Sequence, residues 1–416
     1  MQSSSSSLLS NISLIAGTTI GAGILALPAA TLPVGLWPST VLMVAVWLYM
    51  AVSGLLIAEA NLYVRQQKDQ EEAGLLATIA YLLGKGGAIA AGILYIFMHY
   101  ALLVAYTARG GDILAMAARN LAWLPLPTVP LWWGHVWFAA LLAGLLYFGS
   151  ETFVAQFNSV LLGGVIAAFM GLVGLTVGGL EGGWIDRSFH LPMMPVAVSW
   201  QALGTVVPVM LVAFVFHNVV PVVAKRLEGN KPKICQAILW GSFIPLLMFL
   251  VWNAVILISV GEAAGDPIEL LRQGANSPRI GLAISVFSEL AVATSFIGFV
   301  YGLMGFLEDV LPPGVSQNNG AKFALVFLPP IVFSVLSPTV FFDAIEVAGA
   351  FGVSLLFGVL PAVMVWKLRY VVCEAALVPE TLVPETLVPG KKVMLVAIAS
   401  LAAMVFSEQA VQLLAL

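Results

Sequence analysis

The sequence predicts an all-α polytopic membrane protein with about eleven transmembrane helices. Hydrophobic residues make up 61% of the 416 positions, charged residues make up only 9%, and the mean hydropathy is +1.02, far above that of soluble domains. Apolar segments long enough to cross a bilayer, about 20 residues each, follow one another with short connections. Because no sizeable soluble domain fits between them, residues 1–416 are predicted to form a single transmembrane transporter domain.

The first five spans are predicted from apolar segments bounded by polar or proline-rich runs. The segment after the serine-rich N-terminus lacks the basic region of a signal peptide, so it is kept as the first span. Residues 75–83 are too short to cross and are predicted to form an interfacial helix. The five predicted spans cover residues 10–33, 36–63, 88–117, 136–148 and 153–180.

Six further spans are predicted in the second part of the chain. The last two are separated by residues 372–392, where the sequence Leu-Val-Pro-Glu-Thr recurs every five residues. Regularly spaced prolines exclude a helix, so this segment is predicted to be a semi-extended cytoplasmic linker. The six predicted spans cover residues 200–227, 234–260, 280–311, 323–336, 342–368 and 393–414.

The distribution of basic residues predicts the orientation in the membrane. With the N-terminus inside the cell, 12 of the 17 lysine and arginine residues fall on the inner side and five on or toward the outer side. This asymmetry agrees with the excess of positive charge in cytoplasmic loops. An odd number of spans then places the C-terminus outside, and the predicted location is the bacterial inner membrane.

The first span contains a glycine cluster, residues 17–23, followed by Pro28. In lipid an unpaired backbone group costs several kcal/mol, so an apolar helix is interrupted only where the freed groups line a cavity or bind a ligand. The sixth span repeats the feature, because His217, Asn218 and Pro221 lie at its middle. Two breaks at these positions indicate a ligand site near the centre of the membrane.

The two broken spans are five apart in order and are predicted to run in opposite directions. That arrangement is typical of transporters built from an inverted repeat, which would here comprise residues 10–180 and 198–368, with an extra helix at 393–414. An alternative remains open, in which Gly17 and Gly21 form a helix-packing motif in an intact span and Pro221 is only a kink.

The two breaks together suit a zwitterion. The second half of the first span begins near Gly23, and its free amides and positive dipole end can hold a carboxylate. The first half of the sixth span ends at residues 212–214, and its free carbonyls can accept an ammonium group. A free amino acid is therefore the expected substrate.

Four motifs together resemble the bacterial aromatic amino acid permeases, the tyrosine and tryptophan transporters. They are Gly-Thr-Thr-Ile-Gly-Ala-Gly-Ile-Leu-Ala-Leu-Pro from Gly17, Glu-Ala-Asn-Leu from Glu59, Phe-Val-Phe-His-Asn-Val-Val-Pro from Phe214, and Ala-Thr-Ser-Phe-Ile-Gly from Ala293. The resemblance covers nearly the whole chain. It implies the five-plus-five fold of the amino acid, polyamine and organocation superfamily, an eleventh helix and proton-coupled uptake. The chain departs from the family in its linker and beside His217.

Residues at the breaks, together with aromatic residues of nearby spans, are the candidates for substrate binding. Aromatic rings suit an indole or phenol by edge and face packing, although each ring alone could simply pack in the core or face lipid. The candidates are Thr18, Thr19, Gly21, Ala22, Gly23, Tyr100, Ala213, Phe214, Phe216, His217, Asn218, Phe296 and Phe351.

Ion coupling has several candidate residues. His217 is a plausible proton carrier because histidine titrates near neutral pH and is costly in hydrocarbon unless paired; it could equally be a neutral structural residue. Glu59 and Glu289 are intramembrane carboxylates and further candidates. Thr294 and Ser295 could coordinate sodium, or could hydrogen-bond their own backbone.

The sequence therefore predicts a secondary transporter that imports tyrosine or tryptophan by proton symport and alternating access. The alternative is a sodium-coupled symporter of other neutral amino acids. An enzyme is not expected, because HExxH and GxSxG motifs are missing, and a channel would need a continuous polar stripe. The expected partners are a free amino acid, a proton or sodium ion and the lipid bilayer, without a cofactor, a resident metal or nucleic acid.

Overall fold

A computed structural model describes residues 8–21, 23–68, 74–119, 130–178, 200–260, 278–316, 318–337, 340–372 and 386–414. Every regular element within these ranges is a helix, and none of them is a strand. Ten helices in the described part of the chain are long and apolar enough to cross a membrane, or eleven if the bent N-terminal pair is one span. The predicted all-α membrane fold with about eleven spans is confirmed.

The first span is broken at the predicted glycine cluster. Helix α1, Leu8–Thr19, and helix α2, Gly23–Thr31, are bent by 54° relative to each other. Ile20 N–H still donates to the carbonyl of Ala16, whereas Ile24 N–H donates to the carbonyl of Gly21 at 3.1 Å, three residues back. The regular helical ladder is therefore interrupted between these two bonds. Ala22 lies outside the described residues.

The sixth span is also broken. Helix α8, Trp200–Ala213, is followed by three non-helical residues, by the 3-10 turn η1, His217–Val219, and by helix α9, Val220–Arg226. Pro221 lies in the first turn of α9, where a helix needs no N–H donor. The proline thus starts a second half-helix and does not merely kink a continuous one.

The second and third spans follow the predicted pattern. Helix α3, Leu36–Lys68, extends five residues beyond the predicted end of its span. Helix α4 covers Leu75–Arg119, but Gly84 interrupts it with a φ of 77° and a ψ of −175°. Because glycine adopts positive φ without strain, it separates the predicted short helix before residue 84 from the span that follows.

The remaining spans lie within about five residues of their predicted bounds, and the short helix α13 was not predicted. Helix α5 begins earlier than predicted, directly after Pro130, so the three tryptophans near its start belong to the helix itself. These helices are α5, Leu131–Phe148; α6, Glu151–Gly178; α10, Lys231–Val260; α12, Pro278–Val310; α13, Pro313–Ser316; α14, Asn319–Leu336; and α18, Lys392–Leu414.

The tenth span is not a uniform α-helix. It consists of α15, Val340–Val347, a π-helical stretch η2, Ala348–Val359, helix α16, Leu360–Lys367, and a second π-helical turn η3, Leu368–Val372. π-helical turns widen a helix and are frequent at functional positions. Sequence periodicity does not reveal this widening, because the π-helical stretch η2 consists almost entirely of apolar residues.

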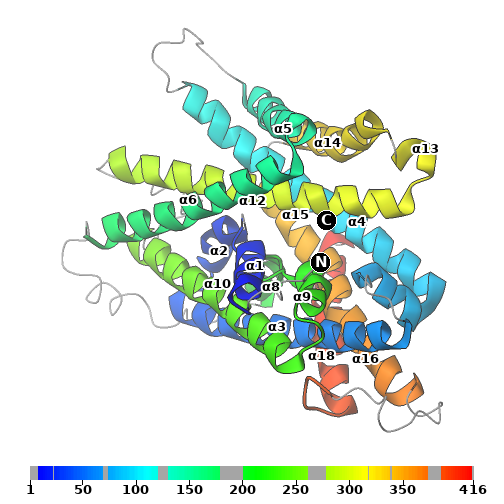
Figure 1. The fold of residues 1–416 in the computed structure, drawn as a ribbon. Helices are drawn as coiled ribbons and strands as arrows, with labels where there is room; N and C mark the ends of the chain where they lie inside the picture. The colour runs from blue at the N-terminus through cyan, green and yellow to red at the C-terminus, as the bar shows by residue number, and fades with distance from the viewer. Residues whose placement is uncertain are drawn as a thin grey trace.

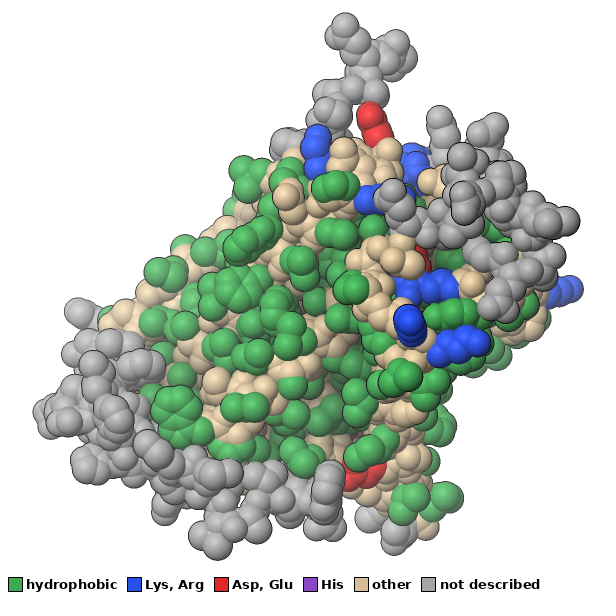
Figure 2. All heavy atoms as spheres, turned by 90° about the horizontal axis from the view of Figure 1, so that it is seen from below, with side chains coloured by type: hydrophobic (Ala, Val, Ile, Leu, Met, Phe, Trp, Pro, Cys, Tyr) green, Lys and Arg blue, Asp and Glu red, His purple; other side chains and the backbone are tan. Residues whose placement is uncertain are grey.

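The two broken spans lie near the middle of the bundle, with α6 and α12 on one side and α3 on the other (Figure 1). Figure 2 shows a face covered mostly by hydrophobic side chains, with lysine and arginine gathered toward one end of the view, as expected of a surface in lipid. Because successive spans cross in opposite directions, the start of α1 lies on the same side as the ends of α3, α9, α12 and η3. This side is called the N side below.

Candidate functional site

The two helix breaks meet backbone to backbone. A Cβ atom built on Gly23, at the start of α2, would lie 2.8 Å from the Ala213 Cα at the end of α8. Both residues are buried. Helices α2 and α8 are the halves of the broken spans that lie farther from the N side. They therefore pack tightly against each other at the breaks.

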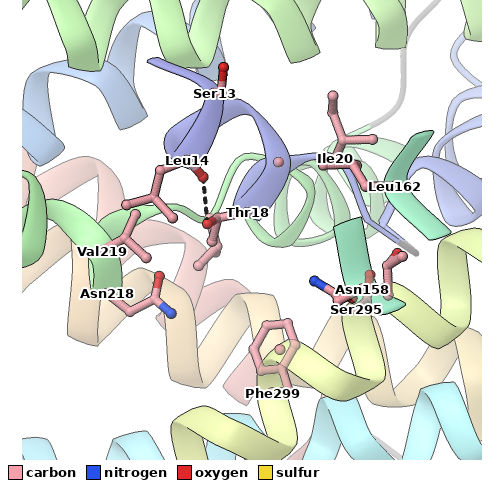
Figure 3. A pocket seen from close by; sticks show the side chains of 14 residues that line it. Ser13, Leu14, Thr18, Ile20, Asn158, Leu162, Asn218, Val219, Ser295 and Phe299 are labelled. Carbon is pink, nitrogen blue, oxygen red and sulfur yellow. Dashed lines mark hydrogen bonds between the residues drawn. The ribbon is translucent and has the colours of Figure 1, made fainter. Parts of the chain in front are cut away.

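The halves nearer the N side enclose a cavity of about 270 Å³. Its walls come from α1, the α9 side of the second break, α6 and α12. Asn218 and Asn158 lie on opposite sides of it, Thr18 lies above and Phe299 below (Figure 3). The cavity thus begins where the two breaks meet and lies on the N side of them.

Two unpartnered amide oxygens distinguish this cavity from a packing defect. The side-chain oxygens Oδ1 of Asn158 and of Asn218 are buried and have no hydrogen-bond partner among the described residues. A buried polar group without a partner costs about 1–3 kcal/mol, so such groups are expected to meet a ligand or water. The cavity can therefore accept hydrogen bonds from a ligand's ammonium group.

The hydroxyl groups of the cavity have backbone partners. Thr18 Oγ1 donates to the Leu14 carbonyl at 2.7 Å (Figure 3), and Thr294 and Ser295 donate to the Ala291 carbonyl at 3.0 and 2.9 Å. Ser295 also lies directly against Gly21, since a Cβ on that glycine would collide with its Oγ. These hydroxyl oxygens keep lone pairs that can face a cation or an ammonium group.

A second cavity, of about 500 Å³, lies next to the first on the N side. Asn218 lines both cavities. The second is bounded by the beginning of α4, by Tyr95 farther along α4 and by Tyr301 and Phe306 of α12. The two cavities therefore adjoin at Asn218, and the second lies nearer the N side.

A row of aromatic rings joins the two cavities along the contact of α4 with α12. The His99 ring lies against Tyr95 in a tilted contact with ring centres 3.9 Å apart and meets the edge of Phe299 at 5.2 Å, and Tyr95 stacks on Phe306 at 5.0 Å. His99 Nδ1 donates to the Tyr95 carbonyl at 2.8 Å, while Nε2 is buried without a partner in the described part of the chain.

Sequence reasoning missed this row and Asn158. The helical spacing of four between Tyr95 and His99, and of seven between Phe299 and Phe306, was the available signal, since residues at these spacings share a helix face. Apolar residues surround them on every side, so the spacing does not stand out in the sequence.

His217 lies between two phenyl rings and outside the lining of the first cavity. Its ring centre is 4.6 Å from that of Phe216 and 4.8 Å from that of Phe357, both nearly parallel to it. The Met50 carbonyl interacts with the imidazole, but neither ring nitrogen has a hydrogen bond of ordinary geometry to a described residue. The imidazole is thus held by stacking.

Among the other predicted residues at the breaks, Thr19 and Phe214 face other helices or their own turn. Thr19 Oγ1 donates to the Ile15 carbonyl at 2.8 Å. Phe214 packs against Phe249 of α10 with ring centres 5.2 Å apart. Of the candidates named from sequence, the cavity lining includes Thr18, Asn218, Thr294 and Ser295.

The three other aromatic candidates point away from the two cavities. Tyr100 donates its hydroxyl to the Leu325 carbonyl of α14 at 2.8 Å. Phe296 packs against Phe138 and Phe327 with ring centres 5.5 and 5.7 Å away. Phe351 meets Phe406 of α18 at 5.2 Å.

The two acidic candidates differ in their surroundings. Glu59 is 1% exposed and forms a two-fold ion pair with Arg369 at 2.7 Å. Glu289 Oε2 is buried, without a partner among the residues described. Within those same ranges, three or more His, Cys, Asp or Glu side chains do not gather into a group that could hold a metal ion.

Comparisons with known proteins identify similar sequences. The sequence profile of the tryptophan/tyrosine permease family matches residues 4–407. A tryptophan-specific transport protein of Pseudomonas aeruginosa is 31% identical over 356 residues, which cover 82% of each chain. Tyrosine-specific transport system 2 of Haemophilus influenzae is 30% identical over 380 residues, and a low affinity tryptophan permease of Escherichia coli is 27% identical over 377 residues; both alignments cover 86% of each chain.

Proposed function

The chain belongs to the tryptophan/tyrosine permease family, and we propose from this membership that it is a secondary transporter importing tryptophan or tyrosine. Family members and the relatives above are permeases, which move a solute and perform no reaction on it. The chain is accordingly a transporter and not an enzyme.

The structural observation that supports the proposal is the cavity beside the two breaks, which is lined by the amides Asn158 and Asn218, by hydroxyl groups and by the ring of Phe299. A free amino acid needs an anion site, a cation site and a pocket for its side chain. The amide groups in the first turn of α2 would suit the carboxylate, apart from that of Ile24, which donates to the Gly21 carbonyl. The carbonyls that end α8 and the amide oxygens of Asn158 and Asn218 suit the ammonium group.

The aromatic side chain of the substrate would meet Phe299. This ring lines the cavity and is held at its edges by His99 and Tyr106, 5.2 and 5.7 Å away between ring centres. Aromatic pairs in such edge contacts gain about 0.5–1.5 kcal/mol beyond burial alone. In the second cavity, Tyr95 and Phe306 offer a second aromatic surface toward the N side.

Alternating access fits the asymmetry of the breaks. The halves α2 and α8 are packed together at Gly23 and Ala213, whereas the halves on the N side flank the cavities. With the N-terminus in the cytoplasm, as the basic residues predict, the conformation is closed to the outside and hollow toward the inside. Import then requires the opposite state, in which α2 and α8 separate.

The five-plus-five inverted repeat would supply this motion. Residues 10–180 and 198–368 would form its two halves, each with one broken span, and residues 393–414 would add a helix with the C-terminus outside. The bacterial inner membrane is the corresponding location. The equivalent position of the two breaks supports this assignment.

Proton symport is proposed for the coupling, with His217 and Glu289 as the residues to test. His217 is next to the second break, and Glu289 carries an unpartnered oxygen inside α12. Glu59 is a weaker candidate because Arg369 already neutralises it.

Sodium-coupled symport of other neutral amino acids is the second candidate function, because one observation favours sodium. Thr294 and Ser295 lie in the lining of the cavity, and Ser295 touches Gly21 of the first break. Hydroxyl and carbonyl oxygens at such a junction are the ligands that a hard cation prefers.

Uptake into proteoliposomes tests the proposed function. Labelled tryptophan, tyrosine and leucine would be offered with and without a pH gradient. We expect saturable uptake of tryptophan or tyrosine, stimulated by an inward proton gradient. Non-saturating flux would indicate a channel, and saturable uptake of leucine alone would contradict the aromatic substrate.

A further inference from the structure

The ion pair between Glu59 and Arg369 lies at the N-side ends of the second and tenth spans. Arg369 Nε donates to Glu59 Oε1 and Nη2 donates to Oε2, both at 2.7 Å. The two side chains are 1% and 8% exposed. A buried pair of this kind is maintained only where its remaining donors and acceptors are also satisfied.

The remaining groups are satisfied by a segment of the chain just before α18. Leu387 N–H donates to Glu59 Oε2 at 3.0 Å. Arg369 Nη2 donates to the Val388 carbonyl at 3.0 Å, and Nη1 donates to the Gly390 carbonyl at 2.9 Å. Both members of the ion pair therefore bind the backbone of this segment: Glu59 accepts from an N–H group, and Arg369 donates to two carbonyl groups.

The side chains and backbone angles of the segment fit the same place. Val388 is 4% exposed and belongs to the hydrophobic core. Gly390 has a φ of 146°, which glycine alone adopts readily. The contact continues into α18, where Lys392 Nζ lies 4.8 Å from the centre of the Tyr370 ring and 5.8 Å from that of Trp366.

We propose that Glu59 and Arg369 form a docking site for the chain's own Leu387–Gly390 segment, which fastens α18 across the N-side ends of the second and tenth spans. The docked residues Leu387, Val388 and Pro389 are the last of three Leu-Val-Pro units that recur every five residues. The last unit of the linker repeat, which the proposed transport mechanism does not use, is thereby the segment that this site binds.

The chemistry of the pair suits docking better than ion coupling. A guanidinium group holds its donors in a fixed planar fork, so Arg369 can grip a carboxylate and two carbonyls at once. Glu59 Oε2 accepts from both Arg369 and Leu387. A carboxylate that moved a proton would have to release these partners in each cycle.

A matched pair of proline variants tests the docking. Leu387→Pro removes the N–H that Glu59 accepts, and Leu382→Pro makes the same change at the same place in the preceding repeat. The readout is cleavage after Glu385 by a glutamate-specific protease in the purified full-length protein. We expect about tenfold faster cleavage for Leu387→Pro, from the loss of one hydrogen bond to a charged group, and the wild-type rate for Leu382→Pro. Equal rates for the two variants would overturn the proposal.

Two further variants test the docking proposal if the Leu387→Pro protein does not fold. Arg369→Lys keeps the positive charge but lacks the planar set of donors that binds Glu59 and the two carbonyls at once. The docking proposal therefore predicts faster cleavage after Glu385. Glu59→Gln separates docking from coupling. Faster cleavage in Glu59→Gln, with an unchanged pH dependence of uptake, supports docking. Wild-type cleavage with an altered pH dependence contradicts it, whatever substrate the protein carries.

Discussion

Gly23 and Ala213 touch across the two broken spans, so closely that a Cβ on Gly23 would lie 2.8 Å from the Ala213 Cα and 3.2 Å from its Cβ. The contact joins the start of α2 to the end of α8. It closes the bundle on the side away from the cavities, and it is the contact that an alternating transporter must break and remake.

Substitution of Gly23 by leucine should abolish uptake, because α2 and α8 can no longer meet. Overpacking at a tight contact costs about 1–3 kcal/mol and shifts the balance between closed and open states. Gly171→Leu is the control, because a Cβ at Gly171 meets nothing within 4 Å. Uptake of labelled tryptophan and membrane insertion are both measured. Normal uptake by Gly23→Leu would contradict a functional closure at this contact.

Gly21→Leu, which would collide with Ser295, should likewise abolish uptake in an inserted protein.

Phe299→Ala should weaken binding of aromatic substrates, because this ring is the aromatic wall of the cavity. We expect the KM for tryptophan to rise about three- to tenfold, the equivalent of one aromatic contact. Phe351→Ala provides the comparison, since Phe351 packs against Phe406 of α18. Initial uptake rates over a range of concentrations give both values. An equal rise in the two variants would remove Phe299 from the site.

His217→Ala should lower uptake and change its dependence on pH if the imidazole carries the coupled proton. His217→Phe preserves the stack between Phe216 and Phe357 and removes the titratable group. The two variants together separate a structural role from a coupling role. Restored uptake with a wild-type pH profile in His217→Phe would leave His217 only the structural role.

Replacement of sodium by choline should leave uptake unchanged under proton symport. If uptake instead falls, Thr294→Val should raise the sodium concentration needed for half-maximal uptake, because it removes a hydroxyl oxygen from the junction with the first break. Sodium dependence that is identical in wild type and Thr294→Val would exclude this hydroxyl as a ligand.

The breaks could be predicted from the sequence because glycine and proline act on the backbone directly. Gly21, Gly23 and Pro221 limit where a helix can continue, whatever the surrounding fold. The positions of most spans follow for a similar reason, since hydrocarbon admits few alternatives to a helix of sufficient length.

The walls of the cavity could not be predicted in the same way. In a helix that is apolar all round, no polar stripe tells which face meets the ligand path. Phe296 and Phe299 are less than one turn apart, yet the first packs against α5 and α14 and the second lines the cavity. Only the packing of the helices distinguishes them.

Contacts between residues far apart in the chain could not be predicted from the sequence either. Glu59 and Arg369 are 310 residues apart, and the docked segment is the last unit of a linker repeat whose sequence does not indicate what it contacts. The π-helical stretch of the tenth span, which brings Phe357 onto His217, likewise has no signature in hydropathy.

Protection of a cysteine in the cavity is the most direct test of the claim that the substrate binds between the two breaks. Gly298 lines the cavity, and a Cβ built on it meets nothing within 4 Å, so Gly298→Cys should be tolerated. The variant is made with Cys235 and Cys373, the two native cysteines, replaced by serine. Tryptophan or tyrosine should slow its reaction with a thiol reagent, and leucine should not. A labelling rate unaffected by tryptophan and by tyrosine, in a protein that still takes them up, would contradict the placement of the site.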